Sequence, residues 1–190
     1  MSNAIEIEAK ALVSAEDYKI LSKAFRGNPR YVQTNHYIDT EDRYLAQEGI
    51  ALRIREKGQS YELTLKTPLS GGLLEKNVPI SFTQFAELRD FGEFPKTDIT
   101  RFLIQLDIDV SKLKILTSLT TERIDVEYQG GLLSLDRNTY SGKTDYEIEL
   151  EYNSMVGAQK IMKDLFHSLG IECVFSEATK VHRAMAAIGK

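Results

Sequence analysis

The sequence predicts an α+β protein in which an eight-stranded antiparallel β-barrel forms a tunnel with a charged interior and is flanked by helices. Apolar and charged residues alternate in about eight separate segments, and this alternation gives each strand one apolar and one charged face. Other segments space apolar residues at three and four, as helices do when they cover a sheet. The 190 residues, 42% of them hydrophobic, are enough to bury a core of this size.

Composition excludes several classes of protein. A net charge of −4 argues against a nucleic-acid binder that relies on a general basic surface. The lone Cys173 permits neither an intrachain disulfide nor a cysteine metal cluster. No apolar run approaches the roughly 20 residues of a membrane helix, and the first residues lack the pattern of a signal peptide. We therefore expect a cytoplasmic protein without a membrane or nucleic-acid partner.

The first half of the chain is expected to be mostly strands. Residues 5–10 alternate without a break and predict the first strand. A helix should follow, opened by Ser14 with Asp17 in the manner of a capping box and ended by Gly27. Further strands are expected at residues 31–40, 50–57, 61–67 and 73–80, with a plain connection over residues 41–49.

The second half of the chain changes period twice. Apolar spacing of three and four predicts two short helices, over residues 83–92 and 98–108. Alternation then returns at residues 115–128, 132–138 and 145–152, and the chain ends with a helix over 154–168, a short strand over 171–175 and a last helix. We expect one domain over residues 1–190, with a helical insert at about 83–108 and C-terminal helices at about 154–188.

The charged faces of these strands, together with the last helix, carry two complementary sets of residues. The acidic set is Glu6, Glu8, Glu75, Asp136, Glu147, Glu149 and Glu151, and the basic set is Lys10, Arg53, Arg55, Lys66, Arg123, Lys180 and Arg183. Exposed faces usually mix in Ser, Thr and Gln, so dense runs of Arg, Lys and Glu favour a charged interior. The alternative is a conventional core with solvated charged faces, which is common in antiparallel sheets.

A charged interior predicts a ligand, because charges removed from water need partners. Arg and Lys bind phosphate oxygens, so the basic set predicts an elongated and highly anionic ligand. The acidic set would repel that ligand unless a hard divalent cation lay between them. Mg²⁺ is held by a few carboxylates together with substrate phosphate oxygens, so a metal ion and a polyanion explain both sets.

Five motifs in a fixed order carry a family resemblance. They are Glu-x-Glu-x-Lys at residues 6–10, Arg-x-Arg at 53–55, Leu-Thr-Leu-Lys at 63–66, Glu-Ile-Glu-Leu-Glu at 147–151 and Thr-Lys-Val-His-Arg at 179–183. Together they resemble the CYTH family, or triphosphate tunnel metalloenzymes, which includes bacterial class IV adenylyl cyclases and thiamine triphosphatases. The resemblance covers nearly the whole chain and points to the short bacterial branch. It implies an eight-stranded tunnel and metal-dependent hydrolysis of a triphosphate.

The resemblance also implies roles for matching residues. The catalytic residues would be Glu6, Glu8, Lys10 and Glu149. Metal ligands would come from Glu6, Glu8, Asp136, Glu147, Glu149 and Glu151, and alternation leaves open which of the last three bind. Phosphates would contact Lys10, Arg53, Arg55, Lys66, Arg123, Lys180 and Arg183. Glu75 matches an acidic position on the fifth strand, whereas Asn77 stands where the family often has a charged residue.

We therefore predict a divalent-metal-dependent triphosphatase that uses Mg²⁺ or Mn²⁺. Its substrate would be inorganic tripolyphosphate or a related small triphosphate, such as thiamine triphosphate or a nucleoside triphosphate. Two alternatives stay open: a class IV adenylyl cyclase, and a non-catalytic module that binds polyphosphate or nucleotide. The acidic set argues against the binding module, because a pure anion binder gains nothing from carboxylates. The protein is expected to be a monomer or a homodimer.

Overall fold

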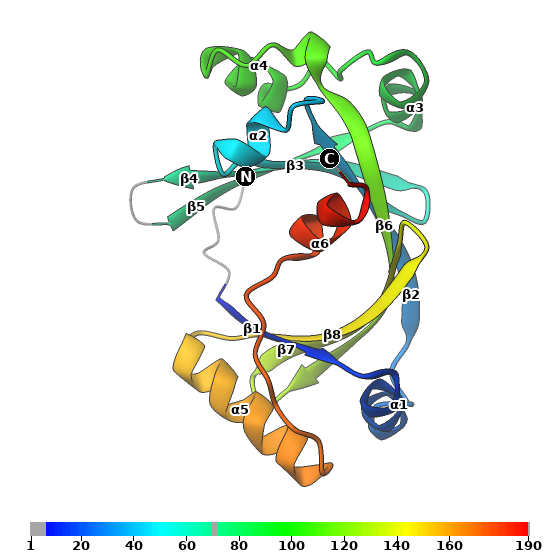
Figure 1. Cartoon of the computed structure of the whole chain (residues 1–190), viewed down its shortest axis with the longest axis vertical. Coiled ribbons are helices and arrows are strands. Elements are labelled where there is room, and N and C mark those ends of the chain that lie inside the picture. Colours follow the sequence, from blue (N-terminus) through cyan, green and yellow to red (C-terminus); the bar gives the residue numbers. More distant parts are fainter. Residues whose placement is uncertain (1–6, 70–71, 190) are drawn as a thin grey trace. The chain divides into compact units, whose positions relative to one another are not determined.

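The computed structural model describes residues 7–69 and 72–189, and these fall into two compact units (Figure 1). Unit 1 comprises residues 33–119 and 180–189, and unit 2 comprises residues 7–32 and 120–179. Two long strands, β2 (Arg30–Asp39) and β6 (Lys114–Tyr128), contribute residues to both units. Each unit has its own hydrophobic core.

One sheet contains all eight described strands. Besides β2 and β6 it holds β1 (Glu8–Val13), β3 (Ala51–Lys57), β4 (Ser60–Leu69), β5 (Gly72–Ile80), β7 (Gly131–Tyr140) and β8 (Lys143–Glu151). Their order is β1-β8-β7-β6-β2-β3-β4-β5. The pairs β1–β8, β8–β7, β7–β6, β2–β3, β3–β4 and β4–β5 are antiparallel. The predicted α+β class, with an eight-stranded antiparallel sheet and flanking helices, is confirmed.

In unit 2, helices α1 (Ala15–Ala24) and α5 (Met155–Ser168) cover the apolar face of the sheet. The helices contribute Leu21, Met162 and Phe166, which are fully buried. The strands contribute alternate apolar residues, among them Ala9, Ala11, Ile124, Leu133, Leu135, Ile148 and Leu150. Ser14 begins α1 as expected, because its hydroxyl accepts the backbone N–H of Asp17 at 3.1 Å.

In unit 1 the apolar face is covered by a different set of helices. These are α2 (Tyr44–Gln47), α3 (Phe82–Phe91) and α4 (Asp98–Gln105); the unit also holds the short 3₁₀ helix η1 (Val110–Lys112) and α6 (Lys180–Ala187). The core joins Leu45, Phe85, Leu88, Ile99 and Leu103 from the helices to Leu52, Ile54, Leu63 and Leu65 from the strands. As in unit 2, the residues between these apolar ones lie on the other face of the sheet.

The charged faces of the strands are not simply solvated. Asp136 and Glu147 are completely buried, and Asn35 and Thr64 are only 2% and 1% exposed. A conventional wet face would leave such side chains in water. The alternative of solvated charged faces is therefore wrong for these residues, which need polar partners or ligands.

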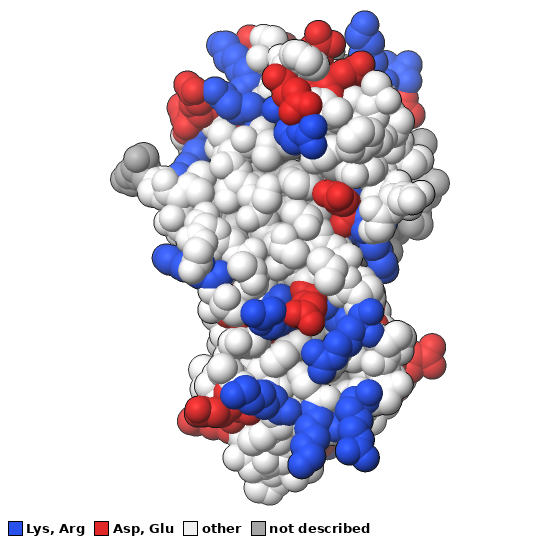
Figure 2. Space-filling view, turned by 90° about the vertical axis from the view of Figure 1, so that its right-hand side faces the viewer, with Lys and Arg blue, Asp and Glu red and all other residues white. Residues whose placement is uncertain are grey.

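The outer surface carries charges of both signs. Figure 2 shows Lys and Arg side chains interspersed with Asp and Glu on the viewed face, with uncharged surface between them. None of the helices in the described ranges is long and apolar enough to cross a membrane.

Two local expectations were wrong. Residues 41–49 are not a plain connection but contain α2, because the buried Asp39 carboxylate accepts the backbone N–H groups of Leu45 and Ala46 at 2.8 and 3.1 Å. Residues 171–175 do not form a strand; only Phe175 makes a bridge, with Ala11. The apolar residues of this segment pack instead against the sheet and helices, and Ile171, Cys173 and Phe175 contact the core of unit 2.

We predict that Gly131→Ala destabilises unit 2. A Cβ on Gly131 would lie 2.6 Å from the backbone oxygen of Glu151 and 3.1 Å from Leu150 Cδ1, so the β7–β8 pair would have to separate. The expected loss of unfolding free energy is about 1–3 kcal/mol, measured by chemical denaturation. Gly27→Ala is the control, since nothing lies within 4 Å of its added Cβ. Equal stability of the two variants would contradict the described approach of β7 to β8.

Candidate functional site

An acidic cluster lies on the charged face of unit 2. Strands β7 and β8 pair so that Asp136 is opposite Glu147 and Ser134 is opposite Glu149. One carboxylate oxygen from each of Asp136, Glu147 and Glu149 lies within 4.8 Å of the other two. These three residues, the acidic cluster, are all members of the predicted metal-ligand set.

Arg123 reaches into the acidic cluster from β6. Its Nε and Nη2 donate to the two carboxylate oxygens of Asp136 at 2.7 and 2.6 Å, and Nη2 also donates to Glu149 Oε2 at 2.7 Å. Burial lowers the pKa of Arg123, but the hydrogen bonds and the charges of Asp136 and Glu149 outweigh it and raise that pKa. The sequence predicted Arg123 as a phosphate ligand, whereas here it pairs with two predicted metal ligands.

The acidic cluster has the chemistry of a site for a hard divalent cation. All three donors are carboxylates, which Mg²⁺ and Mn²⁺ accept as ligands. Each carboxylate offers about four lone-pair sites, so Asp136 and Glu149 can bond Arg123 and still coordinate an ion. The donor set therefore fits the metal that the sequence predicts, with Asp136, Glu147 and Glu149 as the residues to hold it.

Strand β1 places two further predicted residues beside this cluster. Lys10 is opposite Glu149 and Glu8 is opposite Glu151 in the β1–β8 register. Lys10 Nζ donates to Glu8 Oε1 at 2.8 Å. Glu8 and the exposed Glu151 are not within the group of three carboxylates, and Glu6 lies outside the described residues.

A pair of hydrogen bonds from hydroxyl groups to Asp125, next to Arg123, was not predicted. Tyr31 and Ser134 donate to the two carboxylate oxygens of Asp125, at 2.6 and 2.7 Å, and Arg123 Nε lies 4.0 Å from Asp125. Burial, together with the hydrogen bond to Asp125, raises the pKa of Tyr31 to about 12. The alternation placed Asp125 on the face of Arg123, but nothing in the sequence connects it with Tyr31, 94 residues away.

The charged face of unit 1 is mainly basic. Arg53 and Arg55 lie on β3, Lys66 lies on β4, and Lys180 and Arg183 lie on α6. Arg55 Nε donates to Asn35 Oδ1 at 3.2 Å. We call these five residues the basic face.

Four residues of the basic face act on a buried phenol, that of Tyr37. Burial raises the pKa of Tyr37, although the charges of Arg53, Lys180, Arg55 and Arg183 each lower it. The four positive charges all favour the ionised form of the Tyr37 hydroxyl, and they come from both β3 and α6. The tyrosine hydroxyl keeps its proton at neutral pH and is a hydrogen-bond donor among the cations.

Glu75 is an acidic residue opposite Lys66 on this face. Its carboxylate accepts Lys66 Nζ at 2.7 Å and Asn77 Nδ2 at 2.9 Å. Burial alone raises the pKa of Glu75, but the hydrogen bonds from Lys66 and Asn77 outweigh it and lower that pKa. Glu75 is thus a negatively charged partner that positions Lys66 at neutral pH, and Asn77 supports it.

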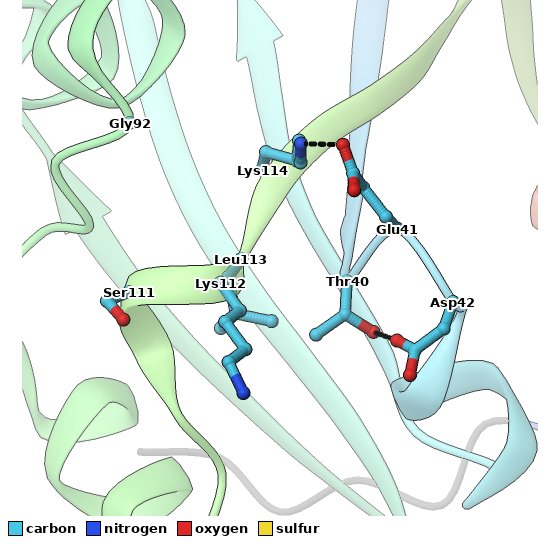
Figure 3. A pocket seen from close by; sticks show the side chains of 8 residues that line it. All are labelled: Thr40, Glu41, Asp42, Gly92, Ser111, Lys112, Leu113 and Lys114. Carbon is cyan, nitrogen blue, oxygen red and sulfur yellow. Dashed lines mark hydrogen bonds and ion pairs between the residues drawn. The ribbon is translucent and has the colours of Figure 1, made fainter.

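A hollow of about 500 Å³ in unit 1 lies apart from the predicted residues (Figure 3). It is lined by Thr40, Glu41, Asp42, Gly92, Ser111, Lys112, Leu113 and Lys114. Lys114 forms an ion pair with Glu41, and Thr40 donates to Asp42 at 2.6 Å. Its charges are matched locally, and we place no function there.

The structure thus sorts the predicted residues by charge. Unit 2 brings together the acidic cluster with Arg123, and β1 adds Glu8 and Lys10 at neighbouring register positions. In unit 1 the charges of Arg53, Arg55, Lys180 and Arg183 act on Tyr37, and Lys66 is bonded to Glu75. Thr64 was not predicted; it lies in the Leu-Thr-Leu-Lys motif, opposite Arg53.

Comparison with known proteins shows what the chain resembles. YjbK of Bacillus subtilis (strain 168), provisionally assigned as a triphosphatase, is 38% identical over 155 residues, which cover 80% of this chain and 79% of YjbK. The crystal structure of a Bacillus halodurans protein, provisionally assigned as an adenylate cyclase, matches with a TM-score of 0.85 and 36% identity over 96% of this chain and 98% of that one.

A third similar protein is a plant protein of known structure. HpAC1 from Hippeastrum, a candidate adenylyl cyclase described as having a dominant triphosphatase activity, matches with a TM-score of 0.82 and 26% identity, covering 95% of this chain and 96% of that one. The model of the CYTH domain matches residues 4–184, nearly the whole length. The chain therefore belongs to the CYTH domain family.

Proposed function

We propose that the chain is a divalent-metal-dependent triphosphatase that hydrolyses inorganic tripolyphosphate or a related small triphosphate. The observation that carries this proposal is the acidic cluster: three carboxylates within 4.8 Å, two of them completely buried, in a chain whose other unit presents a basic face. Carboxylates bind metal ions and cations bind phosphates, so a triphosphate substrate with its metal ion uses both kinds of residue. The triphosphatase names of YjbK and HpAC1 support this choice of reaction.

The acidic cluster and the basic face would have different roles, metal binding and phosphate binding. The acidic cluster would hold Mg²⁺ or Mn²⁺, with Glu8 of β1 as a further candidate ligand, and with Glu6, which lies outside the described residues, as another. Arg53, Arg55, Lys66, Lys180 and Arg183 would bind the phosphate oxygens, and Lys10 would add a charge next to Glu149. Arg123 would keep Asp136 and Glu149 in position through its hydrogen bonds while remaining within reach of the substrate.

Hydrolysis in such a site depends on positioning and on charge. The Arg and Lys side chains would hold the chain of phosphates so that water attacks a terminal phosphoryl group in line with its leaving oxygen. They would also stabilise the negative charge that the leaving phosphate gains. The divalent ion, when bound, would neutralise phosphate charge and lower the pKa of water.

A substrate panel tests this function. Tripolyphosphate, thiamine triphosphate and ATP are incubated with Mg²⁺ or Mn²⁺, and orthophosphate, pyrophosphate and cyclic AMP are quantified separately. A triphosphatase releases orthophosphate, and only with metal. Pyrophosphate with cyclic AMP from ATP would show an adenylyl cyclase instead, and binding without turnover would show a binding module.

We predict that Glu8→Gln lowers metal-dependent turnover of tripolyphosphate by about tenfold to a hundredfold. The change removes a charge near the metal candidates and leaves Lys10, whose Nζ is 2.8 Å from the Glu8 carboxylate, with an uncharged acceptor. Turnover is measured as orthophosphate release over a range of Mg²⁺ concentrations. Glu16→Gln, an exposed carboxylate in α1, is the control and should leave the rate unchanged. Unchanged turnover by the Glu8 variant would contradict its assignment.

A further inference from the structure

Two buried polar atoms of unit 1 have no hydrogen-bond partner among the described residues. They are the hydroxyl oxygen of Thr64 and Nε of Arg53. Thr64 is 1% exposed, so its hydroxyl cannot rely on bulk water. Buried polar groups in native proteins are almost always hydrogen-bonded, and each exception calls for a ligand, a water molecule or a functional reason.

The β-sheet register places these two atoms on neighbouring side chains. Thr64 of β4 is directly opposite Arg53 of β3, and directly opposite Asn77 of β5 on its other side. Its chain neighbours Leu63 and Leu65 are fully buried in the apolar core, so Thr64 lies on the opposite, charged face. Two of the basic-face cations, Arg55 and Lys66, are two residues further along the same two strands and share that face.

Both unpartnered atoms can donate a hydrogen bond. The Arg53 Nε–H is a donor only, and the Thr64 hydroxyl donates or accepts. Two donors on opposite residues among cations are matched by an oxygen that carries negative charge and several lone pairs, as in a phosphate. No described carboxylate fills this role, because neither atom has a hydrogen-bond partner, and Glu75 is bonded to Lys66 and Asn77.

We propose that Thr64 and Arg53 form a subsite that binds one phosphoryl oxygen of the substrate, with the Thr64 hydroxyl as a direct ligand. The subsite rests on the proposed function for the identity of its ligand, a phosphate ester or anhydride. It assigns Thr64 to substrate binding rather than to stability. The distinction is measurable, because an unpartnered buried hydroxyl costs stability in the free protein and is compensated only when the ligand binds.

The test compares Thr64→Val, which keeps the shape and removes the hydroxyl, with Thr64→Ser, which keeps the hydroxyl. Tripolyphosphate binding is measured by calorimetry in buffer with a chelator, so turnover does not interfere. We expect the Val variant to bind about tenfold more weakly or worse, and the Ser variant to stay within threefold of the unmodified protein. Without ligand, the Val variant should melt at the same temperature or higher.

Thr40→Val is the matched control. Thr40 is also a buried threonine of unit 1, but its hydroxyl donates to Asp42 at 2.6 Å and accepts the backbone N–H of Tyr44 at 2.9 Å. Its loss should lower the melting temperature and leave tripolyphosphate binding unchanged. A Thr64 variant that behaves like this control, with lower stability and normal binding, would overturn the subsite.

Orthophosphate is a second probe that separates the subsite from the proposed function. At millimolar concentration it should raise the melting temperature of the unmodified and Ser proteins more than that of the Val protein. If the protein hydrolyses no triphosphate but Thr64→Val still weakens the binding of tripolyphosphate or orthophosphate, the triphosphatase proposal is wrong and the subsite proposal is supported. Hydrolysis of tripolyphosphate with equal oxyanion binding by all three proteins would leave the function and overturn the subsite. Absence of binding of either probe would overturn the subsite, and the function would then be decided by turnover in the substrate panel.

Discussion

Glu147→Gln is expected to lower the turnover of tripolyphosphate by about a hundredfold or more while leaving the fold intact. Glu147 is completely buried, and one of its carboxylate oxygens lies within 4.8 Å of oxygens from Asp136 and Glu149. Gln keeps the shape but removes one of three charges available to a divalent cation, so the metal affinity should fall with the rate. Orthophosphate release and the affinity for Mn²⁺, by calorimetry, are the two measurements.

Metal concentration distinguishes a lost ligand from general damage. The Glu147→Gln variant should recover part of its rate as Mg²⁺ is raised, and its melting temperature without metal should not fall, because the change removes repulsion between carboxylates. Glu172→Gln, at an exposed position between α5 and α6, is the control and should keep both the rate and the Mn²⁺ affinity. A Glu147 variant with a rate within threefold of the unmodified protein would contradict the metal assignment.

Arg123→Met is expected to destabilise the metal-free protein by about 3–5 kcal/mol, because it leaves buried carboxylates without their cation. Arg123 donates three hydrogen bonds of 2.6–2.7 Å to Asp136 and Glu149, and its side chain is only 17% exposed. A divalent cation held by the same carboxylates can replace the lost positive charge. Mn²⁺ should therefore raise the melting temperature of the variant more than that of the unmodified protein.

Arg137→Met is the matched control for this experiment. Arg137 lies on β7 and pairs with Glu122 at 2.9 Å, but both side chains are more than a third exposed, so its loss should change stability by about 0.5 kcal/mol or less. Chemical denaturation gives the free energies, and thermal melts with and without Mn²⁺ give the rescue. An Arg123 variant as stable as the Arg137 variant, or one that Mn²⁺ does not rescue, would contradict the described pairing.

Alternation in the sequence was sufficient to predict which face of each strand is charged. The pattern Leu63-Thr64-Leu65 is typical: the leucines lie in the core of unit 1 and Thr64 lies on the opposite face. Such patterns work because the side-chain period of a strand is two, whatever the strand's neighbours are. The same reasoning placed Asp136 and Glu147 on the charged face, where the register makes them opposite residues.

The hydrogen-bond and ion-pair partners of the charged side chains could not be predicted, because they depend on the strand register between segments that are distant in the sequence. The ion pair of Arg123 with Asp136 was not expected, because it depends on the pairing of β6 with β7, which puts the two residues opposite each other. Tyr31 and Asp125 form a hydrogen bond across 94 residues without any local signal. Helix α2 was missed for a similar reason, since it depends on the buried Asp39 carboxylate rather than on apolar spacing within its own four residues.

A crystal structure with Mn²⁺ and tripolyphosphate, recorded at the manganese absorption edge, tests most directly whether one triphosphate is served by both sets of residues. We expect the anomalous peak to be coordinated by Asp136, Glu147 and Glu149 and the phosphate oxygens to contact Arg53, Arg55 and Lys66 of the same molecule. Manganese and phosphate bound to other residues, or tripolyphosphate that contacts only the acidic cluster or only the basic face, would contradict the proposed function.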